Sequence, residues 1–165
     1  MYPIGSLGGT CVLVADEEYP VMVREMLSGA RRRCLVSMFI VDAGSRSESM
    51  NSIVLALEAA LWRGLDVRIV LGGSRTNLRI AEATAGAAQV FRDRSIPSRW
   101  LTAQQWRGSH AKIVIVDDFV LVGSHNWSVG AFSGQHQDSV RVDSPALAAY
   151  FTALFDAQWL RAGAA

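Results

Sequence analysis

The sequence predicts one α/β domain, residues 1–165, built on a mixed, largely parallel β-sheet that is flanked by helices on both faces. Two observations predict this fold. Segments with strand and helix patterns alternate through the first half of the chain with short joins, which is typical of parallel strands connected by right-handed crossovers. In addition, half of the 165 residues are apolar, which is enough for one sizeable core, and no linker divides the chain.

The strands expected in the first half are short apolar runs, at residues 11–15, 34–41 and 66–71. The run 34–41, CLVSMFIV, is apolar almost throughout, as expected of a central strand covered on both faces, and the run 11–15 is expected to be buried as well. An acidic start at residues 16–18, followed by apolar residues at helical spacing, predicts a helix. A polar loop at 42–51 precedes a second amphipathic helix, which we expect to stop at Gly64.

The second half begins with a glycine-rich loop at 72–77, which lacks the lysine of a P-loop, and an alanine-rich helix at 80–90. Two β-branched runs, KIVIV and FVLVG, are separated by two aspartates and predict a β-hairpin at 112–123. Another strand is expected at 137–143. A Ser-Pro pair then provides the N-cap and first turn of a closing helix.

Composition sets limits on location and partners. The net charge of +1 is not the strong basicity of many nucleic-acid-binding proteins, although a neutral protein can still carry a basic face. Nothing resembles a transmembrane span, and the N-terminal residues lack the pattern of a secretory signal. Cys11 and Cys34 have no metal-ligand spacing and are expected to be buried free thiols. We therefore expect a soluble, cytoplasmic protein that does not bind membranes.

Reactive side chains concentrate in HAKIVIVDDFVLVGSHN, residues 110–126. Because side chains alternate along a strand, His110 and Lys112 share a face, with Cα atoms roughly 7 Å apart. An imidazole and an ammonium at this spacing can both reach one phosphate. The second strand ends in residues 123–126, GSHN, which can return a hydroxyl, a carboxamide and backbone N–H groups to the same place. Such donors stabilise the charge that develops on a phosphoryl group.

An interpretation without catalysis is also open. In that interpretation His110 is an exposed residue at a strand end, Lys112 protects a sheet edge from aggregation, and residues 123–126 form a plain turn. Lys112 is, however, the sole lysine of a chain that otherwise uses arginine for its positive charge. A compact ammonium acts as a point charge beside a phosphate, so this choice favours the catalytic interpretation.

The spacing H-x-K-x4-D followed by G-S-x-N closely resembles the signature of the phospholipase D superfamily. The residues that carry it are His110, Lys112, Asp117, Gly123, Ser124 and Asn126. The resemblance covers nearly the whole chain and points to the small nucleases with a single motif, which implies the phospholipase D/nuclease-like sandwich fold. It also implies a metal-independent phosphodiesterase in which His110 forms a covalent phosphohistidine intermediate while Lys112, Ser124 and Asn126 neutralise the non-bridging oxygens.

Two aspartates are expected to have different roles. Asp138 lies, by alternation, on the inward face of its strand, so it needs a partner, and His110 is the obvious candidate. The superfamily usually places an acidic residue here, often Glu, and this implies that Asp138 fixes the tautomer of the imidazole. Asp117 faces away from His110 and begins the hairpin turn, so we expect it, like Gly123, to be structural and to bond to the hairpin backbone.

Completing the reaction requires an acid on the leaving-group side. Larger relatives carry two copies of the motif and this chain carries one, so we expect a homodimer through the active-site face, with His110 of the second subunit as the acid. The rival is His125 or His136 of the same chain. No carboxylates or His/Cys sets have the spacing of a metal site, so we expect neither metal nor cofactor.

The stretch before the hairpin interleaves arginine with tryptophan, which suits a groove that follows a polyanion and stacks bases. The nucleic-acid-binding candidates are Arg75, Arg99, Trp106 and Arg107. A role for such residues in the core or in a dimer interface is equally well supported. We expect a sequence-nonspecific endonuclease acting on DNA or RNA. The alternatives are a hydrolase of phospholipids or other phosphodiesters, for which an amphipathic membrane helix is lacking, and a non-catalytic nucleic-acid-binding module.

Overall fold

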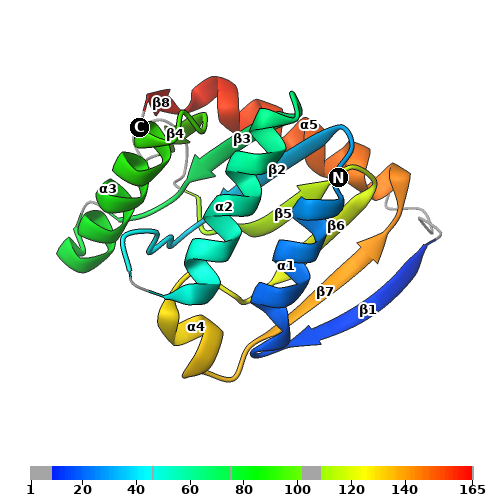
Figure 1. Cartoon of the computed structure of the whole chain (residues 1–165), viewed down its shortest axis with the longest axis horizontal. Coiled ribbons are helices and arrows are strands. Elements are labelled where there is room, and N and C mark those ends of the chain that lie inside the picture. The colour runs from blue at the N-terminus through cyan, green and yellow to red at the C-terminus, as the bar shows by residue number, and fades with distance from the viewer. Residues whose placement is uncertain (1–8, 46, 75, 102–108, 165) are drawn as a thin grey trace.

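The computed structural model describes residues 9–45, 47–74, 76–101 and 109–164. Its described strands form one eight-stranded sheet in the order β1-β7-β6-β5-β2-β3-β4-β8, with helices packed against it (Figure 1). The elements are β1 (Thr10–Ala15), α1 (Glu18–Gly29), β2 (Arg33–Met38), α2 (Glu48–Trp62), β3 (Asp66–Leu71), α3 (Leu78–Asp93), β4 (Ser98–Trp100), β5 (Lys112–Val116), β6 (Phe119–Gly123), α4 (Val129–Ser133), β7 (Asp138–Asp143), α5 (Pro145–Arg161) and β8 (Gly163–Ala164).

The sheet is mixed, as predicted, but its parallel part is small. β2 pairs in parallel with β3, and β3 with β4, whereas the other pairs named in the sheet are antiparallel. The expectation of a largely parallel sheet is therefore corrected. The β5–β6 hairpin and β7 lie between β1 and β2, so the first strand–helix–strand unit does not place its two strands side by side.

Apolar side chains cover both faces of the central strands, which confirms the predicted layers. On one face, α1, α2 and α3 pack over a cluster that includes Val36, Val114 and Leu121. On the other face, α5 packs Phe155 into a second cluster with Ile115. Figure 1 shows α1 and α2 crossing in front of the sheet and α5 behind it.

Local signals set the helix boundaries. The Ser144 hydroxyl accepts the N–H of Leu147 and caps α5, as the Ser-Pro pair predicted. Gly64 follows α2 with a φ of +79°, a conformation that favours glycine. The second helix begins inside the segment predicted as a loop, because the Ser47 hydroxyl accepts the N–H of Met50 and caps it.

The strand β1 lies at the edge of the sheet and is exposed, which corrects the prediction of a buried strand at 11–15. Its Leu13 side chain is 66% exposed. Cys11 is exposed and Cys34 is buried, and both are free thiols. Burial raises the pKa of the Cys34 thiol to about 12, so this thiol stays protonated and unreactive. Cys34 is thus a packing residue, as expected, and Cys11 is not.

Candidate active site

The two halves of the H-x-K…G-S-x-N motif meet at one edge of the sheet. β5 begins at Lys112, directly opposite Met38, the last residue of β2. β6 is the other neighbour of β5 and ends at Gly123. Neighbouring strands lie about 4.8 Å apart. The hairpin therefore returns the G-S-H-N turn to the edge at which His110 and Lys112 lie.

His110 and Lys112 are in contact, in agreement with the shared face predicted from the sequence. The Nζ atom of Lys112 lies 3.2 Å from Nδ1 of His110 and also donates to the His110 carbonyl oxygen at 3.2 Å. The ring of Phe39 flanks both side chains. Its centroid lies 4.2 Å from that of the imidazole, at an interplanar angle of 43°, and 5.2 Å from Nζ. The three side chains form one cluster at the end of β2.

These surroundings lower the pKa of both catalytic candidates. Loss of contact with water, followed by the charge of Lys112, lowers the pKa of His110 below its ordinary value of 6.5. Burial lowers the pKa of Lys112. Since a positive neighbour disfavours the imidazolium form, His110 is neutral at neutral pH. A neutral imidazole has a lone pair with which it can attack phosphorus.

The turn after β6 is set by close packing against β7. A Cβ atom at Gly123 would lie 2.4 Å from the carbonyl oxygen of Asp138, so glycine is required there for a structural reason. The Ser124 hydroxyl donates to the Asp138 carbonyl oxygen at 3.2 Å and accepts the Asp138 N–H at 3.1 Å. In this structure Ser124 therefore fastens the turn to β7.

Asn126 is held by the end of β2. Its Oδ1 atom accepts the N–H of Ile40 at 3.3 Å, and the N–H of Trp127 donates to the carbonyl oxygen of Ile40 at 3.0 Å. The carboxamide oxygen is thus engaged with the backbone, which leaves the NH₂ group as the part of Asn126 that can donate to an anion.

Asp138 pairs with His136 and not with His110, which corrects the predicted role. The strand register places Asp138 in the row of Val122, on the face that α5 covers. Lys112 belongs to the row that faces α1 and α2. Side chains alternate along β7 as predicted. Which of them share a face of the sheet with His110 depends on the register between β7, β6 and β5. The Asp138 side chain is 60% exposed, and its carboxylate lies 3.6 Å from Nε2 of His136.

Asp117 is structural, as predicted, although its partners are not in the hairpin. Its carboxylate accepts the backbone N–H groups of Arg31, Arg32 and Arg33 at 2.8, 2.8 and 3.1 Å. Its φ of 52° is a left-handed conformation that aspartate tolerates. Because β5 pairs with β2, the turn lies beside the α1–β2 connection. These arginines are therefore at the end of β5 opposite to His110.

His125 is a buried structural residue, a role that the sequence did not predict. It is 0% exposed, and its ring stacks on Tyr19 with centroids 4.1 Å apart. Its Nε2 lies 3.3 Å from the Asp16 carbonyl oxygen and its Nδ1 lies 2.8 Å from Oγ of Ser139. A carbonyl only accepts, so Nε2 carries the proton. Burial lowers the pKa of His125, although the carbonyl and charge of Asp16 act in the opposite direction. A histidine enclosed in this way is not placed to donate a proton to a substrate.

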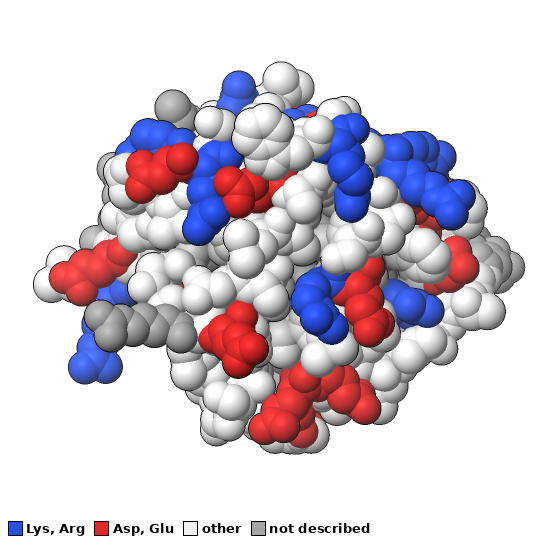
Figure 2. Space-filling model, viewed as in Figure 1, with Lys and Arg blue, Asp and Glu red and all other residues white. Residues whose placement is uncertain are grey.

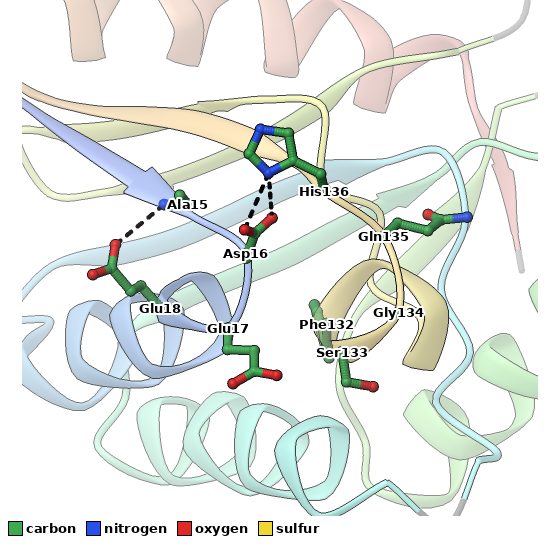
Figure 3. A pocket seen from close by; sticks show the side chains of 9 residues that line it. All are labelled: Ala15, Asp16, Glu17, Glu18, Phe132, Ser133, Gly134, Gln135 and His136. Atoms are coloured by element: carbon green, nitrogen blue, oxygen red, sulfur yellow. Dashed lines mark hydrogen bonds and ion pairs between the residues drawn. The ribbon is translucent and has the colours of Figure 1, made fainter.

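A surface pocket of about 610 Å³ lies beside α4 and the start of α1 (Figure 3). Its lining residues are Ala15, Asp16, Glu17, Glu18, Phe132, Ser133, Gly134, Gln135 and His136. The Nδ1 atom of His136 lies 3.1 Å from the Asp16 carboxylate, and this hydrogen bond raises the pKa of His136. The lining includes no residue of the H-x-K…G-S-x-N motif, so this pocket is separate from the candidate active site.

Of the four candidates for nucleic-acid binding, the structure describes Arg99; Arg75, Trp106 and Arg107 lie outside the described residues. The Arg99 guanidinium carbon lies 4.4 Å from the centroid of the Trp159 ring, and Nη1 donates to the Trp159 carbonyl oxygen at 2.7 Å. This contact joins β4 to α5 and gives Arg99 a structural role, and its contact with nucleic acid stays a prediction.

Charge on the described surface is mixed. Figure 2 shows basic and acidic side chains interspersed on the face that carries α1 and α2, with acidic ones gathered at the lower end. Asp16, Glu17 and Glu18 lie at the start of α1.

Over the described ranges, His, Cys, Asp and Glu side chains do not form any group of three or more that could hold a metal ion.

Comparisons with known proteins give relatives in sequence and in fold. A family model described as "Cardiolipin synthase, PLD-like domain" matches residues 23–159. No curated protein matches the chain. The phospholipase D family member Nuc from Salmonella typhimurium superposes with a TM-score of 0.74 at 24% identity, over 94% of this chain and 97% of Nuc. NucT from Helicobacter pylori gives 0.72 at 17% identity, over 96% and 100%. The archaeal chromatin protein TrmBL2 gives 0.56 at 15% identity, over 100% of this chain and 57% of that protein.

Proposed function

Because the chain belongs to the phospholipase D superfamily through its PLD-like domain, we propose that it is a metal-independent, sequence-nonspecific endonuclease. DNA is the proposed substrate, and RNA is the second substrate class to test. The observation that carries this proposal is the pair formed by His110 and Lys112, whose side-chain nitrogens lie 3.2 Å apart. A neutral nucleophile and a compact cation at this distance can engage the same phosphate.

The proposed reaction has two steps. In the first, an imidazole nitrogen of His110 attacks phosphorus, the P–N bond forms, and the P–O bond to the leaving group breaks while that oxygen takes a proton from an acid on the opposite side. In the second, the same group accepts a proton from water, whose oxygen attacks the phosphohistidine and releases His110. A neutral imidazole is not repelled by the anionic diester, and its lowered pKa favours this form.

Lys112 changes its partner during the first step. In the structure its ammonium donates to Nδ1 of His110, which places the proton of the neutral imidazole on Nε2. A phosphate oxygen is an anionic acceptor and competes well for the ammonium. When Lys112 turns to that oxygen, its charge neutralises the phosphate. At the same time the lone pair on Nδ1 of His110 becomes free to attack.

The G-S-H-N turn supplies further donors to the phosphate. The NH₂ group of Asn126 can donate without breaking the bond that its oxygen makes to Ile40. The Ser124 hydroxyl must first leave the Asp138 carbonyl oxygen. Asn126 is therefore the primary neutralising donor beside Lys112, and Ser124 contributes once the substrate has displaced its present contact.

The acid of the first step is proposed to come from a second copy of the chain. Within one chain, His125 is enclosed by Tyr19, Ser139 and Asp16, and His136 binds Asp16 and Asp138 at a separate pocket. Neither is positioned against His110. Two-fold pairing of the active-site faces places the second subunit's imidazole on the leaving-group side of the phosphate.

A nucleic-acid substrate is supported by similarity of fold. The described helices include none that is long and apolar enough to cross a membrane. Nuc and NucT span nearly the same length as this chain, and TrmBL2 is a chromatin protein with its own mode of DNA binding. The second candidate is phospholipid hydrolysis, for which the description of the matching family, cardiolipin synthase, supports a phospholipid substrate but not the hydrolytic step.

Two assays run side by side test the proposal. Supercoiled plasmid and phosphatidylcholine vesicles are each incubated with the protein in EDTA. Nicking of the plasmid without release of choline or phosphatidic acid supports the nuclease. Lipid hydrolysis without nicking supports the second candidate, and plasmid binding without hydrolysis of either substrate supports a non-catalytic module.

A further inference from the structure

We propose that Phe39 is a positioning residue whose ring holds the imidazole of His110 and the ammonium of Lys112 together at the end of β2. This inference rests on the proposed function only in so far as it concerns turnover. The arrangement itself is a property of the free protein and can be measured without substrate.

The first support is the contact geometry. The Phe39 ring lies 4.2 Å from the His110 ring and 5.2 Å from Nζ of Lys112, so one half-buried aromatic side chain touches both members of the pair. An ammonium near an aromatic face is attracted by the ring quadrupole. The ring also removes part of the imidazole from water. Phe39 thereby restricts both side chains to positions in which their nitrogens lie 3.2 Å apart.

The second support is that the last residue of β2 and the two residues that follow it each contact one residue of the motif. Met38 pairs with Lys112 in the sheet, Phe39 packs on His110, and the N–H of Ile40 donates to Asn126. The segment 38–40 therefore sets the relative positions of nucleophile, cation and carboxamide. Phe39 is the member of this segment whose side chain makes the contact to the nucleophile.

The third support is a backbone contact that fixes Phe39 beside the residue that precedes His110. A Cβ atom at Gly72 would lie 2.9 Å from Cα of Phe39 and 2.4 Å from the carbonyl oxygen of Ser109. The N–H of Gly72 donates to the Met38 carbonyl oxygen at 2.7 Å. A glycine at this position thus lets the segments that carry Phe39 and His110 approach each other closely.

Asp138, the carboxylate expected to orient the imidazole of His110, lies beside another histidine. Asp138 lies with His136, and the contacts of His110 in the described part of the chain are to Phe39 and Lys112. The ring and the ammonium therefore orient this imidazole. Lys112 is the charged group of the described residues that acts on it.

The test compares Phe39→Leu with Phe39→Tyr, which retains the ring, and with Phe119→Leu as the matched control. Phe119 is also half-buried and lies 5.3 Å from the Arg141 guanidinium carbon, at the end of β6 away from the motif turn. Turnover of bis(p-nitrophenyl) phosphate gives kcat and KM. The chain has three histidines, so NMR titration of their ring protons, assigned with His110→Ala and His136→Ala, follows His110 alone.

The proposal predicts that Phe39→Leu lowers kcat about 100-fold at nearly unchanged KM, because the reacting groups lose their alignment. It predicts in addition that the pKa of His110 rises towards 6.5, that Phe39→Tyr restores both values, and that Phe119→Leu changes neither. Unchanged kcat in Phe39→Leu, or lowered kcat with an unchanged His110 titration, would overturn the proposal.

Two measurements on the wild-type protein cover the remaining cases. Nuclear Overhauser contacts between the Phe39 ring protons and those of His110 test the arrangement even if Phe39→Leu does not fold, and their absence overturns the proposal. If the wild-type protein cleaves no phosphodiester, the proposed function fails, whereas the titrations of Phe39→Leu and Phe39→Tyr still decide whether Phe39 orients the imidazole.

Discussion

The Nζ atom of Lys112 donates to Nδ1 of His110 across 3.2 Å, so the sole lysine of the chain bonds to the proposed nucleophile. This relationship has an electrostatic consequence. Burial and the ammonium both disfavour the imidazolium, and the pKa of His110 falls below 6.5. The neutral imidazole, which is the form able to attack, therefore persists to a lower pH than in an ordinary histidine.

The first prediction concerns Lys112→Met, which removes the charge and keeps much of the side-chain volume. Without the positive neighbour, protonation of His110 becomes easier, so its pKa rises. The titration is followed by NMR on the free protein, because the variant also loses the cation that neutralises the phosphate. Arg24→Met, an exposed arginine on α1, is the control and leaves the titration of His110 unchanged. A lower or unchanged pKa in Lys112→Met would contradict the prediction.

The second prediction concerns Asp117. Asp117→Ala removes three backbone hydrogen bonds and places alanine at a φ of 52°, so the free energy of unfolding falls by about 3 kcal/mol. Asp118→Ala is the matched control. Its carboxylate is 40% exposed and pairs with Arg32, which is 60% exposed, so the loss is about 0.5 kcal/mol. Urea denaturation measures both. Equal losses would show that Asp117 does not fasten the α1–β2 connection.

The third prediction concerns the pH dependence of stability, in which two histidines have opposite signs. Burial depresses the pKa of His125, so the unfolded chain binds more protons there and the contribution of His125 to stability falls as the pH drops through that depressed pKa. The hydrogen bond to Asp16 raises the pKa of His136. Its contribution is present below the ordinary pKa and falls as the pH rises through the raised value.

Urea denaturation from pH 5 to pH 8 separates these two contributions. His125→Gln reduces the loss of stability at acid pH that the wild-type protein shows. His136→Gln is the matched substitution at an exposed site. It makes the loss of stability at acid pH larger, because protonated His136 stabilises the folded protein and has been removed. Identical pH profiles for the two variants would contradict the assignment of signs.

The fourth prediction is that the active species is a dimer. Sedimentation equilibrium should give twice the 17.9 kDa mass of one chain, and specific activity should fall when the protein is diluted below the dissociation constant. His110 is needed in both copies, so heterodimers of wild-type and His110→Ala chains lack one of the two imidazoles and should be strongly impaired. A monomer with full specific activity at all concentrations would rule out the shared site.

Local patterns in the sequence are enough to predict the centre of the fold and the contact between His110 and Lys112. The hairpin and the strand 66–71 follow from β-branched runs, and the closing helix follows from the Ser-Pro pair. The contact of His110 with Lys112 follows from alternation within one segment. Each of these features depends on residues close together in the chain, for which local geometry is sufficient.

The features that the sequence does not predict depend on partners far apart in the chain. The carboxylate of Asp117 binds residues 31–33, and His125 stacks on Tyr19. The expected pairing of Asp138 with His110 is wrong because alternation along one strand does not give the register to its neighbours. The edge position of β1 has the same cause, since an apolar strand has similar sequence features whether it is central or at the edge.

The most direct test of His110 as the nucleophile of a metal-independent nuclease is plasmid nicking in EDTA by the wild-type protein, His110→Ala and His136→Ala, each checked for folding by circular dichroism. We expect the wild-type protein and His136→Ala to nick the plasmid at similar rates with EDTA present, whereas nicking by His110→Ala should be slower by at least about 1,000-fold. Nicking that survives in His110→Ala, or that EDTA abolishes and added metal restores, would contradict this expectation.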